Sequence, residues 1–375
     1  MNATPTPHPV TVWMRHEERS TERRAPVVPS DAARLVQGGL IDVVVEESPQ
    51  RVFPAADYTA AGCRIVPTGS WVDAPDGAFV LGLKELPDAD PPVLRHRHIY
   101  FGHAYKGQAD GQALLRRFVA GGGALLDLES LVDEHGHRLA AFGYWAGYVG
   151  AALAVLQAHG RLVTPLEPTT KEALDAALAA CTDGPAGSAG STGSTGPAGR
   201  RSLVIGVNGR SGSGAVAAFA VAGIPVTGWG LAQTKHLDRA ALIGFDILVN
   251  TVLTTHRIPP FVRPEDVIDP GRRLSLISDV TCDVTSDLNV LPIYDAVTTW
   301  EEPVRSLCET PPLDIVAIDN LPSLLPREAS EAFSAELTPE LALLRAGSGQ
   351  DGGPWARARV MFDLAVSRLL PASTA

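Results

Sequence analysis

Residues 202–214 (SLVIGVNGRSGSG) decide the fold of this chain. An apolar run typical of strands passes directly into a glycine-rich turn, and residues 215–222 follow with a helical composition. Glycines let a backbone approach a pyrophosphate, and a helix N-terminus adds N–H groups and a favourable dipole. Gly206, Gly209 and Gly212 are not spaced as GxGxxG, and the Lys-Ser/Thr pair of a Walker A loop is missing. The stretch favours a dinucleotide site, and a turn that only packs strand on helix is the alternative.

Short apolar strands alternate with helices on both sides of this stretch. Such alternation produces a parallel sheet covered on both faces, so we predict an α/β, doubly wound fold. The 375 residues exceed one ordinary core and suit two domains. Ser30 is the expected N-cap of the first helix. Strands are predicted at residues 10–14, 41–45, 63–66, 78–83, 99–102, 124–128, 225–229, 246–250, 274–280 and 313–319, and helices at residues 30–37, at 112–120 and over most of 326–370.

Two further segments differ in composition. Residues 143–162 are apolar on almost every side and repeat small residues, which predicts a buried helix packed closely against a neighbour. Its aromatic side chains are expected in the core rather than in a ligand cage. Residues 183–199 consist almost entirely of Gly, Ser, Thr, Ala and Pro, which predicts a flexible loop without chemistry.

Composition also excludes several classes of protein. The net charge of −11 and the pI of about 5.4 argue against a general binder of nucleic acid or anionic membranes. No apolar run is long enough to span a membrane, and residues 1–9 lack the pattern of a secretory signal. The four cysteines form no CxxC pair, so we expect no metal site and a cytoplasmic location. Small molecules are the expected partners.

Lysine is rare in this chain, and its positions are therefore informative. Of 31 basic residues, only Lys84, Lys106, Lys171 and Lys235 are lysines. Arginine stays protonated in proteins, whereas a buried lysine can lose its proton and act as a base. A coding bias towards arginine is the alternative explanation, so the position of each lysine must decide.

One lysine and one histidine suggest acid–base chemistry. Lys84 ends the strand at residues 78–83, and His103 ends the next strand. Ligands of doubly wound sheets bind at the carboxyl ends of strands, so both side chains should face one crevice, where they would form an acid–base pair. Arg24 and Arg138 are candidates to hold substrate carboxylates. The alternatives are a core histidine and, around Arg24, a solvated charged face.

The strand at residues 225–229 lacks the acid that usually follows the second strand of a dinucleotide fold. That acid holds the hydroxyls of the adenosine ribose, and Gly230 stands near its place here. Lys235, His236 and Arg239 follow within a few residues. NADP, or both dinucleotides, is therefore physically plausible. The alternative is that Lys235 and Arg239 are solvated surface charges.

Four strings resemble the NAD-dependent, lysine-forming saccharopine dehydrogenase family of the fungal lysine pathway, in the wider alanine dehydrogenase group. The resemblance extends over residues 17–368, apart from the segment 183–199. The strings are residues 82–85 (GLKE), 103–108 (HAYKGQ), 136–143 (GHRLAAFG) and 319–330 (DNLPSLLPREAS).

The resemblance implies two Rossmann-like, doubly wound domains with the active site in the cleft between them. Residues 1–141 and 328–375 would form the substrate domain, and residues 142–327 the dinucleotide-binding domain, with 183–199 as a flexible insertion. No metal is implied. The implied catalytic residues are Lys84 and His103; those that bind substrate are Arg24, Arg138, Lys106, Glu85 and Glu129; those that bind NAD or NADP are Gly206, Gly209, Arg210, Ser211, Gly212, Thr251, Asp279 and Asp319.

The implied reaction is the oxidative cleavage of saccharopine to L-lysine and 2-oxoglutarate, or its reversal. Lys84 would take the proton of the secondary amine, and His103 would activate the water that hydrolyses the imine. The resemblance leaves a monomer or a small homo-oligomer open.

The chain also departs from the family pattern. Ser211 and Thr251 stand where fungal members carry cysteines, so no disulfide can form there. Ser278 and Asn320 also differ from that pattern. These changes leave two alternatives open: an opine-type dehydrogenase with another amino acid and keto acid, or a non-catalytic dinucleotide-binding regulator.

Overall fold

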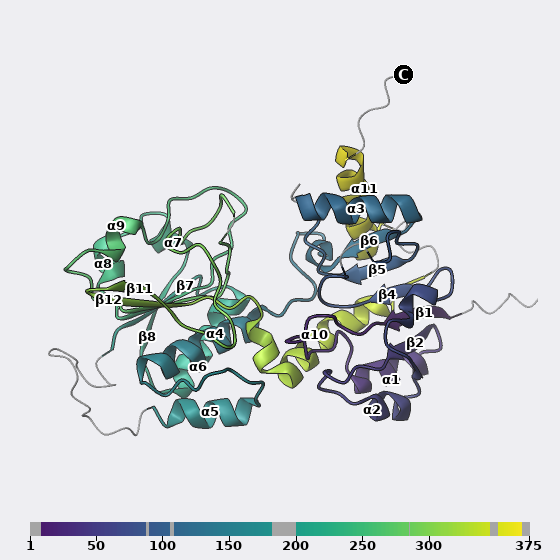
Figure 1. Ribbon diagram of the computed structural model, residues 1–375, viewed down its shortest axis with the longest axis horizontal. Helices are drawn as coiled ribbons and strands as arrows, with labels where there is room; N and C mark the ends of the chain where they lie inside the picture. Colours follow the sequence, from purple (N-terminus) through teal and green to yellow (C-terminus); the bar gives the residue numbers. More distant parts are fainter. Residues whose placement is uncertain are drawn as a thin grey trace, which may run out of the picture. The chain divides into compact units, whose positions relative to one another are not determined.

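The computed structural model describes residues 9–87, 90–105, 109–181, 200–284, 286–345 and 352–369 (Figure 1). The chain divides into two compact units. Unit 1 comprises Met1–Ala141 and Ala329–Ala375, and unit 2 comprises Phe142–Glu328. The segment 183–199, predicted as a flexible loop, lies outside the described residues.

Unit 1 is built on six parallel strands in the order β3-β2-β1-β4-β5-β6. The chain extends the sheet from β1 to β3 in one direction and then returns to add β4 on the other side of β1. This reversal places a topological switch point between β1 and β4, where ligands of such sheets bind. The strands are β1 (Val10–Met14), β2 (Ile41–Glu46), β3 (Arg64–Val66), β4 (Phe79–Leu81), β5 (Arg97–Tyr100) and β6 (Ala124–Asp127).

Helices cover this sheet, and α11 packs on both β6 and α3 (Figure 1). The first helix begins at Pro29 with Val28 as its N-cap, so the expected Ser30 cap is wrong. The physical reason is that proline is preorganised for the first helical position, which moves the start one residue earlier. The helical elements are α1 (Pro29–Gln37), α2 (Ala55–Ala60), η1 (Ser70–Asp73), α3 (Ala109–Gly121), η2 (Leu128–Ser130), α10 (Pro326–Leu341), which begins in unit 2, and α11 (Pro354–Leu369).

Unit 2 contains a second six-stranded sheet, in the order β11-β12-β10-β9-β7-β8. Its strands are parallel except β11, which pairs antiparallel with β12. The sequence did not predict β11, because this strand lies at the sheet edge with charged, partly exposed residues and has no continuous apolar run. The strands are β7 (Ser202–Ile205), β8 (Val226–Trp229), β9 (Ile247–Asn250), β10 (Leu276–Asp279), β11 (Arg305–Glu309) and β12 (Pro312–Val316).

Alternate residues of the unit 2 strands enter two separate hydrophobic clusters. Val204 and Val249 pack with α4, α5 and α6, whereas Leu203, Ile205 and Leu248 pack on the opposite face with α8 and α9 (Figure 1). Both faces are thus covered, which agrees with the predicted doubly wound α/β class. The helical elements are α4 (Gly143–Ala158), α5 (Lys171–Ala179), α6 (Arg210–Val221), α7 (Leu231–Thr234), α8 (Arg239–Ile243), α9 (Pro264–Val267) and η4 (Leu321–Leu324).

Helices α4 and α6 approach each other very closely. A Cβ atom on Gly147 of α4 would overlap the backbone carbonyl of Ser211, and one on Gly214 of α6 would overlap that of Tyr144. The predicted buried, small-residue helix is therefore confirmed, with Tyr148 fully buried, although Tyr144 is partly exposed. This contact holds the start of α6, and with it the glycine-rich turn, against α4.

Replacing Gly147 with alanine should destabilise unit 2 by about 2 kcal/mol or more, because backbone atoms cannot yield as a side chain can. The helical preference of alanine offsets only a part of this cost. Urea unfolding of Gly147→Ala measures the effect. Gly209→Ala is the matched control, because its Cβ would meet its nearest atom at 3.4 Å, an ordinary contact. Equal stability of the two variants would contradict the role of this contact.

Candidate active site

The predicted acid–base residues Lys84 and His103 and the predicted substrate residue Glu129 follow the carboxyl ends of three neighbouring strands of unit 1. Lys84 comes three residues after β4, His103 three residues after β5, and Glu129 two residues after β6. The neighbouring β1 is followed directly by Arg15. Because parallel strands end at one edge of the sheet, these residues lie along the same edge as the switch point between β1 and β4.

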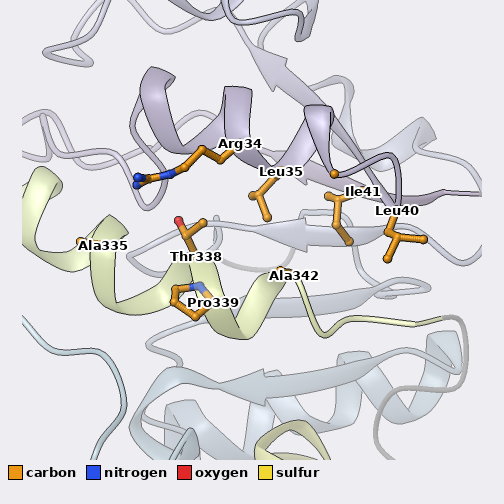
Figure 2. Close-up of a pocket in the computed structure, with 9 residues that line it drawn as sticks. Arg34, Leu35, Leu40, Ile41, Ala335, Thr338, Pro339 and Ala342 are labelled. Atoms are coloured by element: carbon orange, nitrogen blue, oxygen red, sulfur yellow. The ribbon is translucent and has the colours of Figure 1, made fainter.

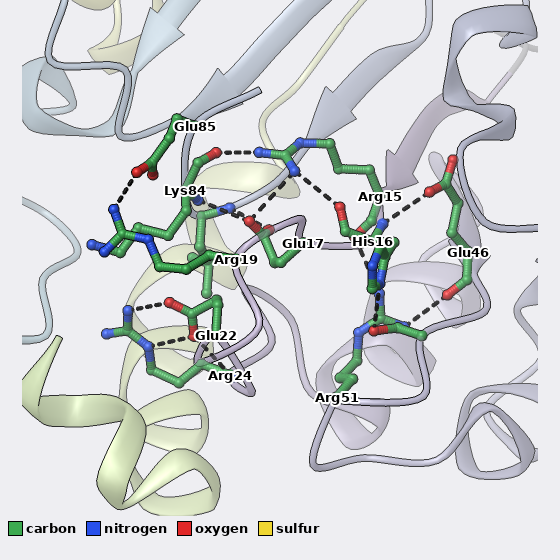
Figure 3. Close-up of polar contacts among 12 residues, drawn as sticks. Arg15, His16, Glu17, Arg19, Glu22, Arg24, Glu46, Arg51, Lys84 and Glu85 are labelled. Atoms are coloured by element: carbon green, nitrogen blue, oxygen red, sulfur yellow. Dashed lines mark hydrogen bonds and ion pairs between the residues drawn. The ribbon is translucent and has the colours of Figure 1, made fainter. Parts of the chain in front are cut away.

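Two buried charged residues hold the backbone of Lys84 (Figure 3). The Glu17 carboxylate accepts the N–H of Leu83 at 2.7 Å and the N–H of Lys84 at 2.9 Å. Arg15 donates to the carbonyl of Lys84 and lies 3.4 Å from the Glu17 carboxylate. Burial raises the pKa of Glu17, against the opposing charge of Arg15. Lys84 is therefore fixed through its own main chain.

Sequence reasoning missed Arg15 and Glu17. Glu17 begins the charged run up to Arg24, which was open to interpretation as a solvated face, and Arg15 lies just before that run. Both side chains are in fact almost completely buried. The available signal was a charged residue directly after an apolar strand. Such a residue is close enough to the core to be buried, and buried charged groups are almost always paired.

Glu17→Gln should lower the free energy of unfolding by about 1–3 kcal/mol, since one amide oxygen must replace two carboxylate oxygens and a buried N–H loses its acceptor. Amide hydrogen exchange at Leu83 and Lys84 should become faster. Exchange measured by mass spectrometry or NMR checks this local effect. Glu18→Gln is the matched control, because Glu18 is the adjacent acid and its side chain is exposed. Unchanged exchange rates of both amides would contradict the role of Glu17 in holding the backbone of Lys84.

Glu129 joins two of the predicted site residues. Its Oε2 lies 3.3 Å from Nδ1 of His103, and its Oε1 accepts a hydrogen bond from Nη2 of Arg138 at 3.1 Å. The hydrogen bond to Glu129 raises the pKa of His103, while burial and the charge of Lys84 oppose this shift. The influence of Lys84 indicates that the predicted acid and base lie within electrostatic reach of each other.

The backbone of His103 is itself unusual, with a φ of +50°. Side chains with a β-carbon seldom adopt this left-handed conformation, which is found mostly where function requires a fixed geometry. It places the imidazole on the exposed side of the strand end, with 56% of its side-chain surface accessible. The alternative of a core histidine is therefore wrong.

Asp127, the last residue of β6, binds the backbone next to His103 and Glu129, and the sequence did not predict this role. Its carboxylate is buried and accepts the N–H of Glu129 at 2.9 Å and that of Gly102. Burial raises the pKa of Asp127 to about 6. The backbones of Gly102 and Glu129 are thus both bound to the Asp127 carboxylate, which helps to orient the side chains of His103 and Glu129.

Glu129→Gln should lower the pKa of His103, because the neutral amide no longer stabilises the imidazolium. The NMR titration of the His103 ring measures this shift, with His103→Gln used to assign its signal. Glu134→Gln, which changes an exposed acid, is the control that should leave the titration in place. A pKa that stays unchanged in Glu129→Gln would exclude the pairing.

Two other predicted substrate residues form ion pairs nearby. Arg24 is buried and binds Glu22 through Nε at 2.8 Å and Nη2 at 2.5 Å. Glu85 is paired with Arg19 (Figure 3). Burial raises the pKa of Glu22, but the charge and hydrogen bonds of Arg24 outweigh it and lower the pKa. The charge of Lys84 adds to this lowering, so the pair lies within electrostatic reach of Lys84. The predicted Lys106 lies outside the described residues.

The glycine-rich turn of unit 2 lies at the switch point between β7 and β9. Gly206 has a φ of +88°, and a Cβ there would come within 2.5 Å of Oγ1 of Thr251. A Cβ on Gly212 would overlap the carbonyl of Gly206. Gly209 is the N-cap of α6, which begins at Arg210 rather than at the predicted residue 215. The turn therefore runs directly into a helix N-terminus, as pyrophosphate binding requires, and NAD fits this cradle.

The other predicted cofactor residues differ in accessibility. Ser211 lies in the first turn of α6, and Thr251, after β9, donates to the carbonyl of Ile205 at 2.7 Å. Asp319 is exposed. Asp279 is buried, and its carboxylate accepts hydrogen bonds from Asn250, from Thr281 and from the hydroxyl of Tyr294. The geometry of Asp279 suits a residue that orders the strand end.

Both departures at Ser278 and Asn320 have a local explanation. Ser278 donates to the carbonyl of Gly150 at 2.9 Å, and Asn320 donates to Ser323 at 2.8 Å. Both side chains are buried inside unit 2. Ser278 joins β10 to α4, and Asn320 joins the start of η4 to the third residue of that helix, so each side chain has a structural role inside unit 2.

An apolar pocket of about 510 Å³ lies elsewhere in unit 1, between α1 and α10 (Figure 2). Thr338 points its buried hydroxyl towards α1 there, and Pro339 interrupts the hydrogen-bond ladder of α10. Its lining contains none of the predicted site residues. Within the described residues, no three metal-ligating side chains gather, and no helix is long and apolar enough to cross a membrane.

Comparison with known proteins defines the class first. The family model "Alanine dehydrogenase/PNT, N-terminal domain" matches residues 13–149. A solved structure of L-alanine dehydrogenase aligns with a TM-score of 0.65 at 16% identity, covering 96% of this chain and all of that one. The chain therefore has the fold of the alanine dehydrogenase group, and the predicted α/β class with Rossmann-like sheets is confirmed.

Curated relatives then define the family. The saccharopine dehydrogenase [NAD(+), L-lysine-forming] of Neurospora crassa is 42% identical over 96% of this chain and 98% of its own length. The enzyme of the same name from Schizosaccharomyces pombe is 37% identical over 96% of this chain and 99% of its length. This chain belongs to the lysine-forming saccharopine dehydrogenase family, as the four strings indicated.

Proposed function

We propose that this chain oxidises saccharopine with NAD and water to L-lysine, 2-oxoglutarate and NADH, or runs the reverse condensation. The main support for this proposal is that Lys84 and His103 follow neighbouring parallel strands, with Glu129 paired to His103. The relatives of this chain are also named for this reaction. Unit 1 would supply the substrate residues, and unit 2 would bind the dinucleotide at Gly206, Gly209 and Gly212.

Each residue has a defined task in this proposal. Lys84 accepts the proton of the secondary amine, which frees the nitrogen electron pair for the C=N bond of an imine. His103 accepts a proton from the water that adds to the imine carbon, and Glu129 stabilises the resulting imidazolium. Arg24 and Arg138 hold substrate carboxylates. The dinucleotide, when bound, supplies the hydride acceptor.

The remaining predicted contacts complete the proposal. Glu85 and Lys106 would flank the substrate. Arg210, Ser211, Thr251 and Asp319 would surround the dinucleotide, and Asp279 would act by ordering its strand end. The four free cysteines suit the cytoplasm, and a monomer or a small homo-oligomer acting on small molecules is expected, without nucleic acid or membrane.

The direct test is NADH formation by the purified chain with saccharopine and NAD. Lys84→Met should lower the rate at least about 100-fold, as loss of a general base does, and should leave NADH binding intact. Lys171→Met is the matched control, since Lys171 lies on α5 and pairs with Asp175. Absence of turnover with saccharopine, together with turnover of another amino acid and keto acid pair, would favour an opine-type enzyme instead.

A further inference from the structure

The end of β8 in unit 2 carries amide groups where a dinucleotide fold usually has an acid. Gly230 directly follows β8. The amide nitrogen of Asn208, from the glycine-rich turn, lies 2.8 Å from the point that a Cβ on Gly230 would occupy. Gln233 accepts the N–H of Gly230 through its own side-chain oxygen at 3.0 Å. Asn208 and Gln233 are thus the side chains closest to this position.

The amide of Asn208 lies where the side chain of an acid at residue 230 would begin. A side chain at residue 230 would require this amide to shift, and with glycine there the amide takes the place that the carboxylate usually has. In dinucleotide folds, a carboxylate here accepts hydrogen bonds from the ribose hydroxyls and repels a 2′-phosphate by its charge. A neutral amide N–H can donate to a hydroxyl oxygen and equally to a phosphate oxygen.

We propose that Asn208 recognises the adenosine ribose in this chain, and that the site accepts NADP and NAD with similar affinity. The inference rests on the proposed function only in taking the glycine-rich turn as the dinucleotide site. The structure also distinguishes the two basic residues, Lys235 and Arg239, that follow β8. Arg239 is held by Asp266 at 3.3 Å and by two backbone carbonyls, whereas Lys235 is exposed just after α7. Lys235 is therefore the better placed partner for a 2′-phosphate.

Binding of the two reduced dinucleotides to the full chain, without saccharopine, tests the first part. Isothermal titration calorimetry with NADH and NADPH gives both dissociation constants. We expect the NADPH constant to lie within about tenfold of the NADH constant, because no carboxylate charge opposes the phosphate. A ratio of tenfold or more in favour of NADH would overturn the inference.

The isosteric variant Asn208→Asp tests the residue itself. It places a negative charge beside the ribose without changing shape, so the ratio of the NADPH to the NADH dissociation constant should rise at least about tenfold. A smaller rise would remove Asn208 from the site. Asn289→Asp is the matched control, because Asn289 accepts the N–H of Leu291 through an oxygen that aspartate retains. Its ratio should equal that of the unmodified chain.

The outcome separates this inference from the proposed function. Similar binding of both dinucleotides without saccharopine turnover would retain the inference and reject the proposed substrate. Turnover of saccharopine, together with NADH binding tenfold or more tighter than NADPH binding, would support the proposed substrate and reject the inference about Asn208. Thermal unfolding of each variant distinguishes a lost contact from a lost fold.

Discussion

Burial of parallel strands on both faces is the constraint on which this structure depends. Inner strands such as β4, β7 and β9 are buried along their whole length, whereas the edge strands β3, β8 and β11 are partly exposed. The polar residues of the predicted sites lie at or just beyond the ends of strands, where the backbone leaves the sheet. The switch points, between β1 and β4 in unit 1 and between β7 and β9 in unit 2, are the places where these ends leave room for a ligand.

Buried carboxylates then fix what the strand ends present. Glu46 is an example. It is fully buried at the end of β2 and accepts hydrogen bonds from the indole N–H of Trp13 and from the backbone N–H groups of His16, Gly69 and Trp71. Glu17 does the same for the backbone of Lys84, and Asp127 for the strand ends that carry the histidine and its partner. Burying a carboxylate is costly unless several donors meet it, so each of these acids orders a loop. The result is a preorganised set of side chains at an otherwise apolar edge.

Much of this could be predicted from the sequence because the signals are local. Alternating apolar runs indicated both sheets, and the glycine-rich turn after an apolar strand indicated the start of a helix. Lys84 and His103 could be selected because each directly follows a predicted strand. Arg15, Glu17 and Asp127 could not, because a charge in a list of residues looks the same whether solvent or a backbone amide surrounds it. β11 escaped for a related reason, since an edge strand needs no continuous apolar run.

The sequence by itself determined the fold class, the family and the residue types at the strand ends, because periodicity, glycine placement and motif strings survive in one dimension. Only the tertiary structure decided which charges are buried and what each one contacts. Glu129 became a bridge between His103 and Arg138, and Asn208 came to fill the space above Gly230, through contacts between segments that are separate in the chain. Such contacts depend on how strand ends converge in space, which sequence spacing does not encode.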